Sequence, residues 1–166
     1  MAGWCRGQSS PRRCAKRWYE RWSERRTPDE WAALGAGTVA KKILIVAGRV
    51  AREGFGEAET RRRLGLTRAE WESGIASLET AGDILQVDAP RTCFISRESV
   101  TSLTRALELE LNSFHKENPM KSGESRLTLR QRLHLSSDDV MSTVIREAIA
   151  AGRVVAAQDR LALKGR

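Results

Sequence analysis

The stretch that decides the fold is Leu111-Asn112-Ser113-Phe114-His115-Lys116-Glu117-Asn118-Pro119-Met120-Lys121-Ser122-Gly123. Apolar residues before and within it recur at steps of three or four: Val100, Leu103, Leu107, Leu111 and Phe114. This spacing predicts one face of a helix of roughly four turns. Pro119 lacks a backbone N–H and disfavours helical backbone at Asn118, so the helix should run from about Glu98 to about Glu117. The chain on either side is predicted to form two units with the same plan.

Three helices and a β-hairpin are predicted in the first unit, residues 39–97. The helices are expected at residues 43–51, 57–64 and 67–82, and the strands at residues 83–88 and 93–96, around the loop Ala89-Pro90-Arg91-Thr92. Gly54-Phe55-Gly56 should end the first helix, and Thr67-Arg68-Ala69-Glu70 is a capping box that opens the third. Trp71, Ile75 and Leu78 recur at helical spacing, so this face should pack against the first helix before Gly82 ends the third.

The second unit, residues 98–166, repeats this order after the long helix. It should contain a helix at residues 127–133, a turn at His134-Leu135, a third helix opened by Ser136-Ser137-Asp138-Asp139, and strands at residues 153–157 and 160–164 around Gln158-Asp159. The inner face of that third helix is expected to be Val140, Val144, Ala148 and Ile149. Arg63-Leu64-Gly65-Leu66-Thr67 aligns with Arg132-Leu133-His134-Leu135-Ser136 of the second unit. The predicted fold class is mainly α (α+β), with two tandem winged helix-turn-helix domains, each of three helices plus a short β-hairpin, joined by a long helix.

Residues 1–38 form a basic leader in front of these units. The whole chain has a net charge of +8, and residues 1–30 hold eight Lys or Arg against four Asp or Glu. Their composition favours a disordered leader, apart from a short helix near residues 28–35 that Thr27-Pro28-Asp29 should open. The alternative is a basic arm that binds nucleic acid, with Trp18, Tyr19 and Trp22 available to stack on bases.

No metal-binding pattern is present among the cysteines and histidines. Cys5, Cys14 and Cys93 have neither Cys-x-x-Cys spacing nor an even number, which indicates reduced thiols and a cytoplasmic protein. His115 and His134 each lack a carboxylate, Cys or second His at ligand or triad spacing. We therefore expect no metal site, and structural or exposed roles for both histidines.

The sequence also lacks the patterns of an enzyme active site or a membrane span. Asp138 and Asp139 would point about 100° apart on a helix, so helix capping explains them better than acid–base catalysis. No Gly-x-x-x-x-Gly-Lys-[Ser/Thr] loop occurs, and no apolar run approaches about eighteen residues. We expect no catalytic residues, no cofactor and no membrane partner.

Nucleic acid is the partner class that the charge pattern permits. In DNA-reading winged helices the start of the third helix enters the major groove, close to phosphates. Asp138 and Asp139 stand there in the second unit and would repel the backbone. The first unit is the better candidate for phosphate contact, through Arg61, Arg62, Arg63, Arg68 and Arg91. A solvated charged face explains the same arginines without any partner.

One set of residues resembles a known family. The pattern is Leu111-x-x-Phe114-His115-x-x-Asn118-Pro119-Met120-x-x-Gly123, followed by Leu129-Arg130-x-Arg132-Leu133. It resembles the second winged-helix domain of SelB, the bacterial selenocysteine-specific translation elongation factor. That family has Phe-His-x-x-x-Pro-Leu-Arg-x-Gly followed by Glu-Leu-Arg-x-Arg, whereas this chain has Met120-Lys121 for Leu-Arg and Thr128 where an acid is common. The motif residues are thus Phe114, His115, Pro119, Gly123, Arg130 and Arg132. Residues 39–97 are similar to the first winged helix of the family.

The resemblance implies a part in selenocysteine incorporation during protein biosynthesis. The full factor has a GTPase domain and β-barrels that carry selenocysteinyl-tRNA, then four winged helices, of which the last ones bind the insertion hairpin in the mRNA. The chain would be a fragment covering the first two winged helices, the arm between the catalytic body and the RNA-reading tip. GTP would bind the N-terminal domain of the family, which this sequence does not contain. The implied partners are mRNA or ribosomal RNA, the rest of the factor, and the ribosome.

Two other function classes fit the predicted fold. One is a free-standing winged-helix regulator that binds DNA, and the other is a protein-binding adaptor. A DNA reader needs base-edge donors such as Arg, Asn or Gln at the start of its reading helix. The second unit has Ser136, Ser137, Asp138 and Asp139 at that place, which weighs against the DNA-binding alternative.

Overall fold

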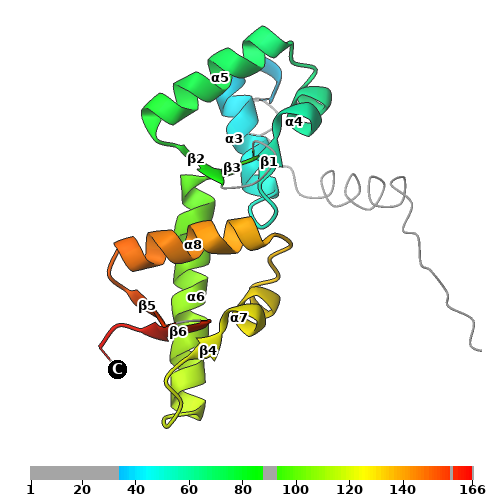
Figure 1. Ribbon diagram of the computed structural model, residues 1–166. Helices are drawn as coiled ribbons and strands as arrows, with labels where there is room; N and C mark the ends of the chain where they lie inside the picture. Colours follow the sequence, from blue (N-terminus) through cyan, green and yellow to red (C-terminus); the bar gives the residue numbers. More distant parts are fainter. Residues whose placement is uncertain (1–33, 88–92, 158, 166) are drawn as a thin grey trace, which may run out of the picture. The chain divides into compact units, whose positions relative to one another are not determined.

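The computed structural model describes residues 34–87, 93–157 and 159–165 (Figure 1). The predicted leader lies almost wholly outside these residues, and so does most of the short helix expected at residues 28–35. The loop with Arg91 is likewise outside them. The remaining chain is two successive units of helices and small sheets, as the sequence predicts.

The first unit has three helices and one sheet. Its elements are α3 (Val39–Arg49), β1 (Phe55–Gly56), α4 (Glu57–Leu64), α5 (Arg68–Ala81), β2 (Ile84–Val87) and β3 (Cys93–Ser96). The sheet is antiparallel in the order β1-β3-β2, so the predicted hairpin gains a third strand. β1 was not predicted, because two residues carry no alternating pattern. α3 begins four residues earlier than predicted, since Thr38 caps it by accepting a hydrogen bond from the Lys41 N–H.

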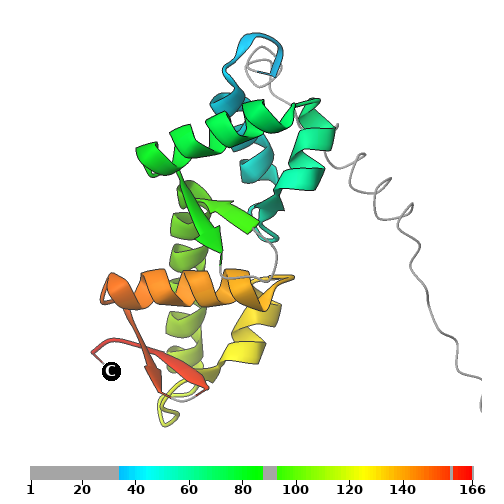
Figure 2. The same ribbon diagram turned by 45° about the horizontal axis from the view of Figure 1, so that its top comes forward.

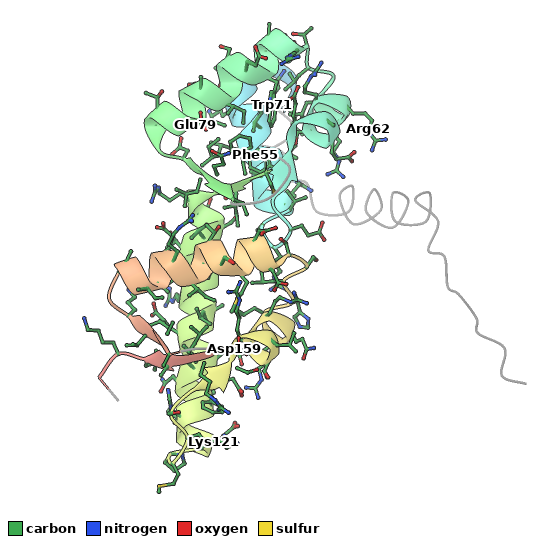
Figure 3. All side chains as sticks on the ribbon, in the orientation of Figure 1. Phe55, Arg62, Trp71, Glu79, Lys121 and Asp159 are labelled. Atoms are coloured by element: carbon green, nitrogen blue, oxygen red, sulfur yellow. The ribbon has the colours of Figure 1, made fainter. Side chains whose placement is uncertain are left out.

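The core of the first unit is built between α3, α5 and the sheet. The rings of Phe55, Trp71 and Phe94 contact one another at centroid distances of 5.9–6.3 Å. Figure 3 labels Phe55 and Trp71. Gly74 on α5 lets α3 approach closely, because a Cβ there would lie 2.8 Å from Ile43 Cδ1. The predicted packing of the third helix against the first is therefore confirmed.

The capping box predicted before α5 is present in full. The Thr67 hydroxyl accepts from the Glu70 N–H, while the Thr67 N–H donates to the Glu70 carboxylate at 2.8 Å. The bonds from Thr67 lower the pKa of Glu70 because they favour the charged carboxylate. Gly82, with φ of 73°, ends the helix as expected.

The second unit repeats this arrangement. Its elements are α6 (Arg97–Glu117), β4 (Glu124–Ser125), α7 (Arg126–Arg132), α8 (Asp138–Ala150), β5 (Val154–Ala157) and β6 (Arg160–Leu163). The sheet order is β4-β6-β5, again one strand more than predicted. α6 ends at Glu117, where the Asn118 N–H still donates to the Phe114 carbonyl before Pro119 breaks the helix. All five predicted inner-face residues of α6 are buried.

One residue of α8 lies on a different face from the predicted one. Ile149 was predicted on the inner face of α8 but is 42% exposed, because Met141 and Ile145 occupy that face with Val140, Val144 and Ala148.

His134, in the tight turn between α7 and α8, has φ of 54°. It takes the left-handed conformation that Gly65, with φ of 66°, adopts in the first unit, as their alignment in the repeat suggests.

The hydrophobic core of the second unit extends into the first sheet. A single buried cluster joins Val87 and Ile95 of the first sheet to Leu107 of α6 and to Val140 and Leu161 of the second unit. Figure 2 shows α8 between the β2–β3 and β5–β6 hairpins, and α8 contacts both β2 and β5. Residues 38–166 accordingly form one compact unit. The domain boundary predicted between residues 97 and 98 stays a prediction.

Replacing Gly54 with alanine should lower the free energy of unfolding by about 2 kcal/mol or more, since a left-handed non-glycine residue costs about 1–2 kcal/mol before any clash. Gly54 has φ of 74°, and a Cβ there would lie 2.6 Å from Cys93 Sγ and 3.2 Å from the Phe94 carbonyl oxygen. Gly48→Ala is the matched control, because Gly48 lies within α3 with open space around it. Urea denaturation should show the control unchanged or stabilised by up to about 1 kcal/mol. Equal stability of the two variants would contradict this account of Gly54.

Candidate nucleic-acid interface

The described arginines predicted to contact phosphate lie on two neighbouring helices. Arg61, Arg62 and Arg63 form the last turn of α4, and Arg68 is the first residue of α5. The short turn through Gly65 places these helix ends next to each other in the chain. Arg62 and Arg68 are the most exposed, with 72% and 76% of their side chains accessible. Figure 3 shows Arg62 on the outer side of α4.

Every one of these four arginines pairs with a glutamate of its own helix. Arg61 Nη1 lies 2.8 Å from Glu57 Oε1, and Arg68 Nε lies 2.7 Å from Glu72 Oε1. Arg62 and Arg63 both pair with Glu59. These glutamate partners were not predicted, although a spacing of three or four residues on a helix is the sequence signal for such pairs.

Each of these pairs lies within one helix, and those of Arg62 and Arg68 are the most exposed, so these two arginines can change partner at low cost. An exposed ion pair between residues three or four apart on a helix contributes roughly 0.2–0.5 kcal/mol. A phosphate could replace the glutamate at Arg62 or Arg68 without disturbing the fold. Arg63 is more enclosed: burial lowers its pKa, and its bond to Glu59 opposes that effect. The exposed arginines of the first unit are thus paired with glutamates, but Arg62 and Arg68 can give up these partners for a phosphate.

The start of α8 in the second unit is arranged differently. Ser137 caps the helix by accepting from the Asp139 N–H at 3.1 Å, as predicted. Asp138 pairs with Arg130 Nη1 of α7 at 2.6 Å, so its charge is already balanced. Arg126, also on α7, donates to the Asp138 carbonyl at 3.1 Å and to the Ser142 hydroxyl. Arginines of α7 therefore contact the start of α8, the part of the helix that lies close to phosphates in DNA-reading winged helices.

The motif residues that carry the family resemblance have structural roles. Arg132 bridges Glu110 of α6 at 3.5 Å and Glu124 of β4 at 4.0 Å. A Cβ at Gly123 would lie 2.6 Å from the Leu161 carbonyl oxygen, so only glycine lets this segment approach β6. With the Arg130 pair above, the motif joins α6, α7, α8 and the sheet.

The aromatic part of the motif is buried at the end of α6. Phe114 is 3% exposed and His115 is 4% exposed, with ring centroids 5.5 Å apart. Lys121 Nζ lies 5.9 Å from the Phe114 ring centroid, a distance at which a cation is attracted to an aromatic face. Pro119 stops the helix between these residues. The buried rings and the Lys121 contact thus hold the α6–β4 connection against the rest of the second unit.

No catalytic or metal centre emerges from the part of the chain that the structure describes. Within residues 34–87, 93–157 and 159–165, no three His, Cys, Asp or Glu side chains converge as metal ligands. The helices among those residues are also too short or too polar to cross a membrane. Burial raises the pKa of the Cys93 thiol and the charge of Asp139 raises it further, the opposite of what a nucleophilic cysteine needs.

Comparison with known proteins agrees with the pattern in the sequence. Residues 109–163 match the family model described as "Elongation factor SelB, winged helix". In fold, the chain is similar to the mRNA-binding domain of elongation factor SelB from E. coli, solved in complex with SECIS RNA, with a TM-score of 0.52. That match covers 83% of this chain and 98% of the other at 9% identity, so it concerns the fold alone. No curated protein sequence matches the chain. The family that this chain resembles is therefore SelB, in fold over most of its length and in sequence over residues 109–163.

Proposed function

We propose that this chain acts as the winged-helix arm of a SelB-type elongation factor during selenocysteine incorporation. The observation that carries the proposal is the family match over residues 109–163, which contains the motif from Phe114 to Arg132. In this role the chain links the GTPase and tRNA-carrying body to the part of the factor that reads the mRNA hairpin. Its partners are then RNA, the rest of the factor and the ribosome, in the cytoplasm.

The structure supports an arm because it favours a fixed geometry over a reading surface. The single helix α6 runs from the first sheet to the far end of the second unit, and the core of the second unit reaches Val87 and Ile95 of the first sheet. The basic residues of α7 are engaged inside the second unit, through Arg126, Arg130 and Arg132. These arginines thus hold the second unit together.

Weak, sequence-tolerant RNA contact by the first unit completes the proposal. Arg62 and Arg68 can exchange their glutamates for phosphates, while the more enclosed Arg61 and Arg63 add positive charge beside them. Arg91 and the basic leader add charge to the same chain. Phosphate contacts supply affinity without sequence information. The mode of contact is therefore electrostatic, and it assists positioning on RNA rather than hairpin selection.

Fluorescence anisotropy with three labelled probes tests this function: a SECIS-type hairpin, a scrambled stem-loop and a DNA duplex. We expect the two RNAs to bind equally within about threefold, with affinity falling steeply as salt rises. The variant Arg61→Gln, Arg62→Gln, Arg63→Gln, Arg68→Gln should weaken both RNAs alike. In a plot of the logarithm of the binding constant against the logarithm of the salt concentration, the variant should also have a slope shallower by about 0.7–0.9 for each phosphate that it no longer neutralises.

The matched control neutralises two other exposed cations, Arg105→Gln with Lys164→Gln, and should leave the slope within about 0.5 of the parent. Deletion of residues 1–30 should weaken binding to every RNA. A hairpin preference of about tenfold, or 1.4 kcal/mol, that persists near 0.2 M salt would mean that these units read sequence. Preferential binding of one DNA sequence would favour the transcriptional regulator instead.

We also expect this chain to bind no GTP, because its sequence contains no phosphate-binding loop. Calorimetric titration of the purified chain with GTP and Mg²⁺ should give no heat of binding at concentrations up to about 1 mM. A chain of the same family that includes the GTPase domain serves as the positive control. Saturable GTP binding by this chain would show that a nucleotide site exists outside the patterns considered above.

A further inference from the structure

The internal repeat allows the outer faces of the two sheets to be compared residue by residue. In the first sheet, Leu85 pairs with Ile95 and Val87 with Cys93, so these four side chains share the face turned away from α5. In the second sheet the same pairs are Val155 with Ala162 and Ala157 with Arg160. We call these four-residue sets the first and the second outer face.

A helix covers the first outer face. Val87 and Ile95 are each 1% exposed and belong to the same buried cluster as Val140 and Met141 of α8. Leu85 and Cys93 pack against this cluster at its margin. The first outer face is thus a docking surface for an amphipathic helix, and α8 of the next unit occupies it. We call such a helix-docking surface a seat.

The acidic first turn of α8 lies close to this seat. The position of a Cβ at Gly54 is 2.6 Å from Cys93 Sγ and 3.7 Å from Val140 Cγ2, so sheet, turn and helix meet there. The charge of Asp139 acts on the Cys93 thiol across the same contact. The seat therefore places an acidic helix start against the strand position of Cys93.

The second outer face has the same geometry but is exposed. Val155 is 48% exposed, and Ala157 and Arg160 are exposed as well. Small side chains at positions 157 and 162 leave room for a helix to come close to the strands. At the position equivalent to Cys93 stands Arg160, a cation where the helix on the first outer face places an acid. Its Nη1 donates to the Gly123 carbonyl at 3.0 Å, a neutral partner that leaves the charge of Arg160 unbalanced.

We propose that the outer face of β5–β6 is a docking surface for an amphipathic helix with an acidic first turn, supplied by another polypeptide segment. The charge complementarity between Arg160 and such a helix start, and the occupied equivalent seat on β2–β3, select this occupant. A second copy of this chain cannot supply its own α8, because Val140, Met141 and Val144 are already buried. Nucleic acid is the weaker occupant, since the face carries a single cation among small apolar side chains. The inference does not depend on the proposed role in translation.

The probe is a synthetic peptide of residues 136–151, which contains the helix that fills the first seat. Titrated into the intact ¹⁵N-labelled protein to about 2 mM, it should shift the amide signals of residues 154–163 with a Kd near or below about 1 mM. A peptide of scrambled order should shift none of them. Val155→Lys should weaken binding at least about tenfold, because docking would bury an unpaired charge.

Leu109→Lys is the matched control, because Leu109 is an equally apolar residue, 61% exposed, on α6 rather than on the sheet. It should bind the peptide within about twofold of the parent. In Arg160→Glu, the unchanged peptide should bind at least about fivefold more weakly, while a peptide with Asp138→Lys and Asp139→Lys should recover the loss. Thermal melts of each variant verify that the fold is intact, and Ala157→Arg replaces any variant that fails.

Three results would overturn the proposal. The first is an absence of shifts at the highest peptide concentration in a protein that remains folded. The second is a shift map centred on β2–β3, which would mean that the peptide displaces α8 from its own seat. The third is a short RNA stem-loop that shifts residues 154–163 while the peptide does not, which would assign the face to nucleic acid.

Discussion

Replacing Leu107 with alanine should lower the free energy of unfolding by about 2–5 kcal/mol and should destabilise both units together. Leu107 is fully buried in the middle of α6 and belongs to the cluster that includes Ile95 of the first sheet and Leu161 of the second. A cavity at this point weakens the packing on both sides of the shared helix. Two domains with separate cores would instead become less stable on one side alone.

Urea denaturation measures the total effect, and hydrogen exchange shows where it falls. The amides of β2–β3 and β5–β6 should lose protection by the same free energy in Leu107→Ala, since both open through one global transition. Leu109→Ala, at an exposed neighbouring position of the same helix, should change stability by no more than about 0.5 kcal/mol. Loss of protection confined to one hairpin would show that the two units unfold independently.

Replacing Phe114 with alanine should cost about 3–5 kcal/mol, the range for truncation of a buried aromatic side chain. Phe114 is 3% exposed in the last turn of α6, beside His115 and under Lys121. Its removal would open a cavity where the α6–β4 connection is anchored.

The stability of Phe114→Ala can be compared with that of Leu127→Ala, a truncation on α7 at a side chain that is 56% exposed. Thermal denaturation should separate the two clearly, with the control within about 0.5 kcal/mol of the parent. If Phe114→Ala costs less than about 1 kcal/mol, Phe114 is not a core residue. The second unit would then lack the anchor that its motif predicts.

The family motif of this chain is a packing motif. Gly123 permits close approach to β6, and the arginines at positions 130 and 132 join α7 to α8, α6 and β4. None of these contacts requires a bound partner. Matching this motif therefore identifies the fold of the second unit strongly, while it says little about which surface meets RNA.

Local signals were enough to predict most helices and both hairpins. The capping box at Thr67, the stop at Pro119 and the three-to-four spacing along α6 each depend on neighbours in the chain, so the sequence contains them directly. The two-residue strands β1 and β4 were not predicted, because two residues are too few to carry an alternating pattern. Ile149 was misplaced because α8 is apolar on more than one side, and the choice between Ile145 and Ile149 depends on what lies opposite.

By itself, the sequence determined the repeated winged-helix plan, the shared helix and the resemblance to SelB. Only the tertiary structure showed that the core of the second unit extends to Val87 and Ile95 of the first sheet, that Arg130 and Arg132 are engaged within the second unit, and that the second outer face is exposed. The physical reason is the range of the interactions. Capping and helical periodicity act over three or four residues, whereas the contacts of Arg132 with Glu110 and of Ile95 with the α8 cluster join positions far apart in the chain, which no local pattern encodes.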